Sequence, residues 1–483
     1  MNYYQFMVPR LNGLEIRERF SHYRALVRKG VAGFIVFGGE LETVRTYIRK
    51  LQDEAEIPLI ISADLERGLG QQLTGGTHFP PAMALAAAYK NRQRAKDKGL
   101  KGHSSRDLAF IRRSFEAVAE EAGFAGINTI FAPVLDINTN PKNPIIAARA
   151  FGEEPGIVSL FGTEMIRTFQ KNNIAACGKH FPGHGDTAVD SHIRLPVLKQ
   201  DMSRLRRYEL RPFLAAIKAG VKMIMLGHLS VPAIDPSGVP VSLSGEAVHF
   251  LRREMAFDGI LITDALNMGG IGRYSEQEAA RRSLLAGVDI LLHPSAPDLL
   301  AGYLAKDHAP CAPDRLLRFR QGQMTAGKQQ APLFDRHRRL ARQLIEDSMS
   351  IAGQCLIDRA PLVVILQDDH GEKGGAFIRA MEKWFPGTRT LRIGPESRRP
   401  ALRKGPREIM IAAIFSETKA WKGGAGGWLR RQTSALKPYA DLVVSFGSPY
   451  LLDDLGKTPR LCAFWDHDQA QEAAVSALKR HFT

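Results

Sequence analysis

The residues from Lys179 to His192 read KHFPGHGDTAVDSH, a stretch that holds three histidines, two aspartates and a lysine. Two chemistries use such a set, because histidine and aspartate can hold a metal ion or can move protons during bond cleavage. Asp190 and His192 lie two residues apart, so in an extended segment both side chains point to one face and the carboxylate can hold an imidazole N–H. The cation of Lys179 beside the cluster disfavours a metal. The spacing therefore favours acid–base chemistry.

A second candidate is Asp264, which ends the apolar part of GILITDALNM and has no positive charge next to it in the sequence. A carboxylate at such a position can attack the anomeric carbon of a sugar. An aspartate there can equally cap a helix that follows. The position of Asp264 in the sequence is compatible with both interpretations.

A third group of polar side chains occurs in SADLERGLG and APVLDINTNPKNPIIAARAFG, which contain Asp64, Asp136, Asn138 and Arg149. A ligand rich in hydroxyl groups needs donors and acceptors of this kind. The surrounding Gly, Pro and Asn residues also permit a purely structural role in Asx turns and loop caps.

Short apolar segments that end in polar residues alternate with longer amphipathic segments, which predicts repeated β–α units on a parallel sheet. We count eight such apolar segments, at residues 3–9, 33–38, 58–64, 129–136, 174–180, 222–228, 259–264 and 288–293. Helices are expected between them, for example at 14–28, 106–122, 201–220 and 245–256. Eight units in about 300 residues is the size of a (β/α)8 TIM barrel, whose active site lies at the carboxyl ends of the strands.

The polar candidates gather at those expected strand ends, namely Asp64, Asp136, Lys179, His180, His228, Asp264 and His293. After a basic helix expected at 335–350, the pattern restarts with apolar segments at 362–366, 409–415, 442–446 and 461–464 and helices at 376–384 and 469–481. The predicted fold is therefore α/β: an N-terminal (β/α)8 TIM barrel at 1–345 followed by a smaller three-layer α/β sandwich domain at 355–483.

The amino-acid composition indicates which binding partners and which cellular compartment to expect. The 483 residues contain four cysteines far apart without a CxxC pair, which argues against a disulfide framework and favours a reducing compartment. Neither a signal-peptide core nor a membrane-spanning run is found, so a soluble cytoplasmic protein is expected. The net charge of +16 is spread along helix-like segments without interleaved aromatic residues, so we expect neither nucleic acid nor membrane as a partner. The sequence leaves the oligomeric state open.

The motif KHFPGHGDT followed by DSH, with APVLD and RAFG upstream and TDAL downstream, resembles the β-N-acetylglucosaminidase (β-N-acetylhexosaminidase) branch of glycoside hydrolase family 3. The resemblance covers the barrel from about Tyr3 to His293. The second domain resembles the C-terminal domain of those members of the family that have two domains. It implies Asp264 as the covalent nucleophile and His192, with Asp190, as acid/base. It also implies that sugar hydroxyls are bound by Asp64, Arg149, Lys179 and His180. This sequence has RAFG where many members of the family have RSFG. It has ADLERG where many members have an Asp-Gln-Glu-Gly-Gly run.

The implied function is that of a retaining β-N-acetylglucosaminidase that removes terminal β-linked N-acetylglucosamine through a glycosyl–Asp intermediate, without a metal or cofactor. Its substrate would be an oligosaccharide or muropeptide containing N-acetylglucosamine, and cell-wall (peptidoglycan) recycling its setting. Three alternatives remain: a glycoside phosphorylase or β-glucosidase of the same family, a metal-dependent hydrolase on the same barrel, and a sugar-binding protein without turnover. The loop with Pro182, Gly183 and Gly185 is expected to close over the bound sugar.

Overall fold

The computed structural model describes residues 2–97, 104–307, 313–322, 330–368, 371–395, 405, 408–416 and 427–483. The chain forms two compact units. The first contains Met1–His78, Arg112–Asn140 and Gly152–Arg338, and the second contains Phe79–Ile111, Pro141–Phe151 and Arg339–Thr483. The second unit thus includes two segments from the N-terminal half of the chain, whereas the predicted domains were continuous. The predicted boundary between 345 and 355 stays a prediction.

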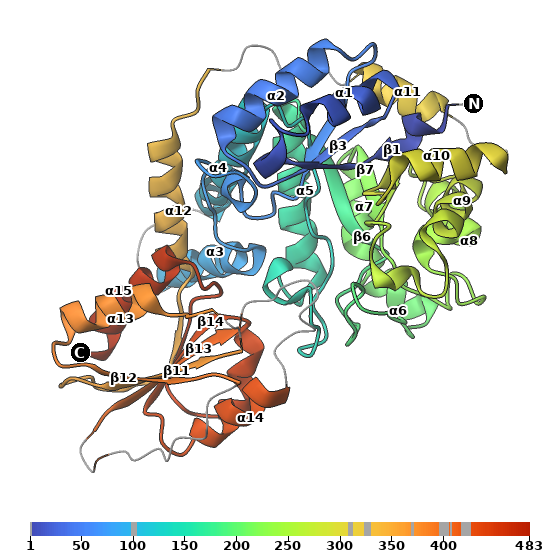
Figure 1. Ribbon diagram of the computed structural model, residues 1–483. Helices are drawn as coiled ribbons and strands as arrows, with labels where there is room; N and C mark the ends of the chain where they lie inside the picture. The colour runs from blue at the N-terminus through green and yellow to red at the C-terminus, as the bar shows by residue number, and fades with distance from the viewer. Residues whose placement is uncertain are drawn as a thin grey trace. The chain divides into compact units, whose positions relative to one another are not determined.

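The first unit is a closed barrel of parallel strands (Figure 1). One sheet runs in sequence order through β2 (Arg10–Asn12), β3 (Gly33–Phe37), β4 (Ile60–Ala63), β5 (Thr129–Ile130), β6 (Ala175–Phe181), β7 (Met223–Leu226) and β8 (Ile260–Thr263). The strand β1 (Met7–Val8) pairs in parallel with β9 (Leu291–Leu292). Ile290, next to β9, bridges Ile262 of β8, and β1 leads directly into β2, so the ring closes. The predicted TIM barrel is confirmed.

Helices follow the strands along the chain. They are α1 (Phe20–Arg28), α2 (Leu41–Asp53), α3 (Ala82–Asp97), α4 (Ser104–Ala125), α5 (Pro155–Lys171), α6 (Met202–Arg207), α7 (Leu210–Lys218), α8 (Gly245–His249), α9 (Glu276–Ala286) and α10 (Pro297–Lys306). Local sequence explains several of their ends. The Glu40 side chain accepts hydrogen bonds from the first N–H groups of α2, and Ser275 does so for α9, which ends at Gly287 in the left-handed conformation.

Two predicted elements differ from the observed ones. The segment 3–9 begins as a 3-10 turn, η1 (Tyr3–Phe6), because Asn2 accepts a hydrogen bond from Tyr4 N and caps the turn. The helix expected at 201–220 is split into α6 and α7. Pro212 explains the split, since its ring would clash with the carbonyl of Tyr208 in a continuous helix and it offers no N–H.

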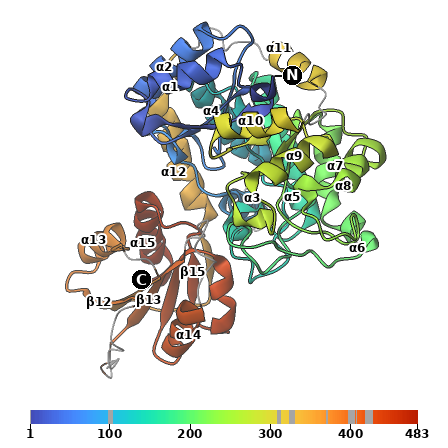
Figure 2. The same cartoon turned by 45° about the vertical axis from the view of Figure 1, so that its right-hand side comes forward.

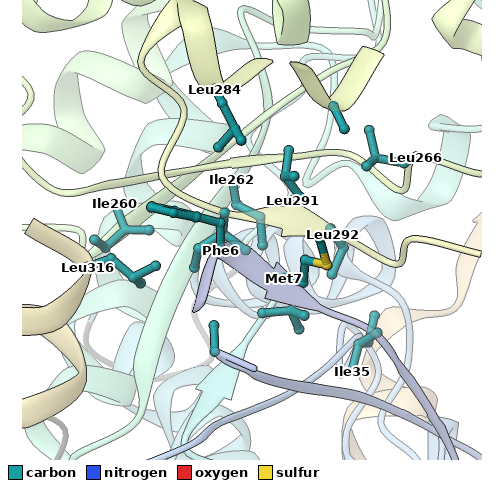
Figure 3. Packing of buried hydrophobic residues seen from close by; sticks show 14 of the residues in the cluster. Phe6, Met7, Ile35, Ile260, Ile262, Leu266, Leu284, Leu291, Leu292 and Leu316 are labelled. Atoms are coloured by element: carbon teal, nitrogen blue, oxygen red, sulfur yellow. The ribbon is translucent and has the colours of Figure 1, made fainter. Parts of the chain in front are cut away.

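Apolar side chains fill the barrel and the space beneath its helices (Figure 3). Phe6, Met7, Ile260 and Leu291 belong to this cluster together with Leu316 of α11 (Asp314–Gly322). The buried Arg320 at the other end of α11 donates to the carbonyls of Ile57 and Pro58, just before β4. The helix α11 is therefore fixed to the barrel by both apolar and polar contacts.

The second unit contains a sheet in the order β10 (Ser350–Ala352), β15 (Arg460–Cys462), β14 (Leu442–Gly447), β13 (Met410–Ser416), β11 (Leu362–Gln367) and β12 (Arg389–Ile393). Figures 1 and 2 show α14 (Gly427–Leu436) on the face opposite α13 (Gly375–Trp384) and α15 (Asp468–Phe482). Alternation along the strands explains the three layers: Val363 and Ile365 pack with α13 and α15, whereas Val364 and Leu366 pack with α14. The predicted α/β sandwich is confirmed.

The strands β10 and β12 were absent from the sequence prediction. Both lie at the edges of the sheet, and β10 is the antiparallel one. Their residues are largely exposed or half-buried, so they lack the continuous apolar run that marks the central strands. The basic helix expected at 335–350 is α12 (Phe334–Ser348).

One buried cluster of the first unit predicts a pH-dependent stability. His337 of α12 lies 2.8 Å from Glu121 and 3.3 Å from Glu120, and although burial opposes its charge, these carboxylates raise its pKa to about 9. Because the pKa of His337 is higher in the folded state than its ordinary value of about 6.5, protonation of His337 favours folding. The full stabilisation is present at pH values below about 6.5 and is lost as the pH rises through 9.

We therefore expect the melting temperature to fall between pH 6.5 and pH 9, and His337→Gln to flatten that slope. Thermal unfolding of both proteins over this range measures the difference between them. Equal slopes would show that His337 carries no extra proton in the folded state.

Candidate active site

The parallel strands bring their carboxyl ends to one mouth of the barrel, where TIM-barrel enzymes carry their active sites. Within the first unit, Asp64 follows β4, Lys179 and His180 lie in the last part of β6, Asp190 and His192 lie in the loop after β6, and Asp264 follows β8. The structure therefore brings together Asp64, Lys179, His180, Asp190, His192 and Asp264, as their hydrogen bonds and mutual charge effects show.

Asp264 lies directly after β8, and its N–H donates to Leu226 O of the neighbouring strand. The next helical element begins only at Gly269, so the interpretation of Asp264 as a helix cap is wrong. Burial alone would raise the pKa of Asp264. The charges of His180, His228 and His192 and a hydrogen bond from Ala265 N outweigh burial, so the pKa is lowered. The carboxylate is therefore ionised at neutral pH, as a nucleophile must be.

His192 is held by Asp190 as the two-residue spacing predicts. Asp190 Oδ1 lies 2.8 Å from His192 N and 2.9 Å from His192 Nδ1. The aspartate side chain is buried, with 1% exposed, whereas the histidine side chain remains 19% exposed. Because the carboxylate engages Nδ1, the ring presents Nε2 as the nitrogen that can exchange a proton with a ligand.

Lys179 is buried between two carboxylates. Its Nζ lies 2.6 Å from Asp64 Oδ1 and 2.7 Å from Glu66 Oε1, and only 3% of its side chain is exposed. Two predicted sugar ligands are thus bonded to each other. Glu66 was missed from the sequence, although its spacing from Asp64 in ADLERG is the same as the spacing that links Asp190 and His192.

Asp136 organises the turn that follows β6. Its fully buried carboxylate accepts hydrogen bonds from His184 N at 2.6 Å, from His180 N at 3.3 Å and from the ring at His180 Nδ1, 2.7 Å away. Burial would raise the pKa of Asp136, but the charges of His180 and His184 and the hydrogen bonds outweigh it and lower the pKa. An ionised carboxylate can only accept, so His180 Nδ1 must carry a proton and Nε2 faces away from Asp136.

Two further histidines of the site have a lowered pKa. Burial lowers the pKa of His184 to about 4, and its Nδ1 lies 2.6 Å from Thr187 Oγ1. Burial also lowers the pKa of His228, whose Nε2 lies 3.0 Å from the carbonyl of Ala265 and whose Nδ1 lies 2.6 Å from Ser242 Oγ. Since a carbonyl can only accept, Nε2 donates, and His228 fixes the main chain next to Asp264.

The loop expected to close over the sugar is packed against the loop after β5. A side chain at Gly185 would lie 1.9 Å from Ile137 O, and Asn140 N donates to Gly185 O. Asp186 accepts hydrogen bonds from Thr139 Oγ1 and Gln200 Nε2. A closing movement on ligand binding stays a prediction.

Arg149 belongs to the second unit, at the end of the 3-10 turn η4 (Ala147–Arg149), where its Nη1 donates to Ile145 O. Its role as a sugar ligand stays a prediction. In the described part of the chain, no three His, Cys, Asp or Glu side chains are arranged to hold a metal ion. Within the same described residues, no helix is long and apolar enough to cross a membrane.

The geometry around Asp136 predicts the effect of Asp136→Asn. The amide has one acceptor oxygen for three N–H donors and its own N–H2 would face a donor, so His180 loses its fixed orientation. We expect kcat/KM to fall about 10- to 100-fold, chiefly through KM because His180 is a predicted sugar ligand. Steady-state kinetics on a variant with a native circular dichroism spectrum measures this. An unchanged KM would show that the Asp136 contact does not orient His180 toward the ligand.

A closed parallel barrel with an ionised carboxylate and carboxylate-bound histidines at its mouth defines a TIM-barrel enzyme. A model of the glycosyl hydrolase family 3 N-terminal domain matches residues 5–307, and the chain belongs to glycosyl hydrolase family 3.

Comparisons with known proteins agree with this family. The chain is 34% identical over 261 residues to Beta-hexosaminidase A of Pseudoalteromonas piscicida, an alignment that covers 51% of this chain and 41% of the relative. It is 32% identical over 268 residues to a Beta-N-acetylglucosaminidase/beta-glucosidase of Cellulomonas fimi, an alignment that covers 53% of this chain and 44% of the relative. The chain therefore spans less than half the length of these two relatives.

The fold is also similar to a solved structure over nearly the whole chain. A glycoside hydrolase family 3 beta-N-acetylglucosaminidase from Paenibacillus sp. str. FPU-7 superposes with a TM-score of 0.81 at 25% identity. The match covers 99% of this chain and 96% of the Paenibacillus chain, so it includes both compact units.

Proposed function

We propose that this chain is a retaining β-N-acetylglucosaminidase in which Asp264 is the nucleophile and His192, oriented by Asp190, is the acid/base. The observation that supports the proposal most is that the two loops are in contact: Gly269 N, five residues after Asp264, donates to the carbonyl oxygen of His192 at 3.2 Å. The names of the related proteins support N-acetylglucosamine as the sugar.

In the first step, an Asp264 oxygen attacks the anomeric carbon while His192 Nε2–H gives its proton to the departing glycosidic oxygen. The bond between carbon and the aglycone oxygen breaks, and a glycosyl ester of Asp264 forms. In the second step, His192 Nε2 takes a proton from water, the water oxygen attacks the anomeric carbon, and the ester bond to Asp264 breaks. Both groups return to their starting state.

The substrate class we propose is an oligosaccharide or muropeptide that ends in β-linked N-acetylglucosamine. Asp64, Lys179 and His180 of the first unit would bind its hydroxyl groups. Cell-wall recycling in the cytoplasm is the setting that the family resemblance suggests. Because Lys179 is bonded to both Asp64 and Glu66, the sugar would meet an already ordered group of charges.

The test is a series of aryl β-glycosides that differ only at the 2-position of the sugar. We expect release of the aryl group from the 2-acetamido sugar to exceed release from the 2-hydroxy sugar by at least about 100-fold in kcat/KM, since a polar group that loses its partner is costly. Comparable rates would instead favour the β-glucosidase alternative. The assay is run with and without phosphate, because formation of a sugar phosphate would identify a phosphorylase.

A further inference from the structure

The loop that carries His192 lies directly on the loop that carries Asp264. Gly269 and Gly270 form the start of the 3-10 turn η7 (Gly269–Ile271), five and six residues after the nucleophile. Gly269 N donates to the carbonyl oxygen of His192 at 3.2 Å. A main-chain contact therefore joins the acid/base residue to the nucleophile loop.

Gly269 and Gly270 lie so close to the main chain of the acid/base loop that neither position has room for a side chain. A β-carbon on Gly269 would lie 2.6 Å from Ile193 O and 2.9 Å from His192 O, and one on Gly270 would lie 2.5 Å from Ser191 O. Neither glycine has a positive φ, so its backbone conformation alone would accept alanine. Because the atoms in contact are main-chain carbonyls, an added methyl group can be accommodated only if one loop moves away from the other.

The segment from Asp190 to Arg194 is a compact turn. The N–H groups of Ile193 and Arg194 both donate to Asp190 O, at 3.0 and 3.2 Å, and the Asp190 side chain holds His192. Pushing on the carbonyls of Ser191 or Ile193 would therefore displace the turn as a unit. The Asp190–His192 pair would persist while its position relative to Asp264 changed.

We propose that Gly269 and Gly270 are positioning residues that set the separation between His192 and Asp264. The inference rests on the proposed function, since it assumes that these two side chains act on the same glycosidic bond. The nucleophile loop thereby supports the acid/base loop, so a substitution at Gly269, whose β-carbon would meet only atoms of the acid/base loop, weakens proton transfer and spares nucleophilic attack.

The test compares two aryl N-acetyl-β-glucosaminides, one with a dinitrophenyl leaving group that needs no proton and one with an unsubstituted phenyl group that does. For Gly269→Ala we expect kcat/KM to fall about 10- to 100-fold with the phenyl substrate and less than about 3-fold with the dinitrophenyl substrate. Gly270→Ala should lose activity with both substrates, because its β-carbon also approaches Cβ of His228 at 2.8 Å and His228 fixes the main chain next to Asp264.

The ratio of the two kcat/KM values does not depend on the fraction of folded enzyme, so a destabilised variant still tests the proposal. Gly156→Ala and Gly245→Ala are matched controls, because both glycines face open space; each should keep the wild-type ratio. If Gly269→Ala lost both activities equally, or neither, the positioning role would be wrong. If His192→Ala itself showed no selectivity for the leaving group, the proposed function would fail instead.

Discussion

Replacement of Asp264 by alanine is expected to lower kcat by about 10⁴-fold or more, because no covalent intermediate can form without the carboxylate. The fold should persist, since the contacts of the turn around Asp264 include its main-chain bond to Leu226 and the bond of His228 to Ala265 O. Steady-state turnover of an aryl N-acetyl-β-glucosaminide measures the loss. Calorimetric titration with N-acetylglucosamine should still detect binding, because the predicted sugar ligands remain.

Asp298→Ala is the matched control for this substitution. Asp298 is exposed at the start of α10 and bonds Lys29 and Tyr4, far in sequence from the site residues, so kcat should change less than about 2-fold. Near-wild-type turnover in Asp264→Ala would rule out the nucleophile role. Turnover with inversion at the anomeric carbon would likewise rule out the covalent mechanism.

The lowered pKa of Asp264 also predicts the acid side of the pH profile. The active form is the carboxylate, so a lowered pKa keeps the nucleophile active at lower pH than an ordinary aspartate would be. Loss of activity on this side should therefore lie below about pH 4.

Replacement of His192 by alanine is expected to separate two kinds of substrate. With a disaccharide, whose leaving group needs a proton, kcat/KM should fall about 10²- to 10⁴-fold. With a dinitrophenyl glycoside, kcat/KM should be nearly unchanged, while kcat falls because water is no longer activated in the second step. A burst of released aryl group followed by slow turnover measures this in a stopped-flow assay.

Azide provides a control for the His192 prediction. As an anion it attacks the anomeric carbon of the glycosyl ester without a general base, displaces Asp264 and leaves a β-glycosyl azide, so it should restore the kcat of His192→Ala. In Asp264→Ala, any glycosyl azide formed would be the α-anomer, because azide would attack the substrate in place of the carboxylate. Asp190→Ala should show a milder form of the same selectivity, since it removes the partner of Nδ1. Equal losses with both substrates would show that His192 is not the proton donor.

Local sequence determined those parts of the protein that depend on neighbours within a few residues. Apolar segments of the right length predict the barrel strands and the central strands of the second unit, because burial on both faces requires such runs. The two-residue spacing of Asp190 and His192 predicts their hydrogen bond, but the structure makes it in a turn and not in an extended segment: the Asp190 carboxylate accepts from His192 N as well as contacting the ring.

Tertiary structure alone decided the contacts between segments far apart in the chain. Asp136 holds His180 from the loop after β5, Glu66 shares Lys179 with Asp64, and Gly269 N donates to His192 O. The edge strands β10 and β12 belong to the same class, since they gain their hydrogen bonds from β15 and β11 and show no apolar run of their own. Such contacts depend on how closely two main chains approach each other, and that distance is set by the packing of the whole barrel or sheet.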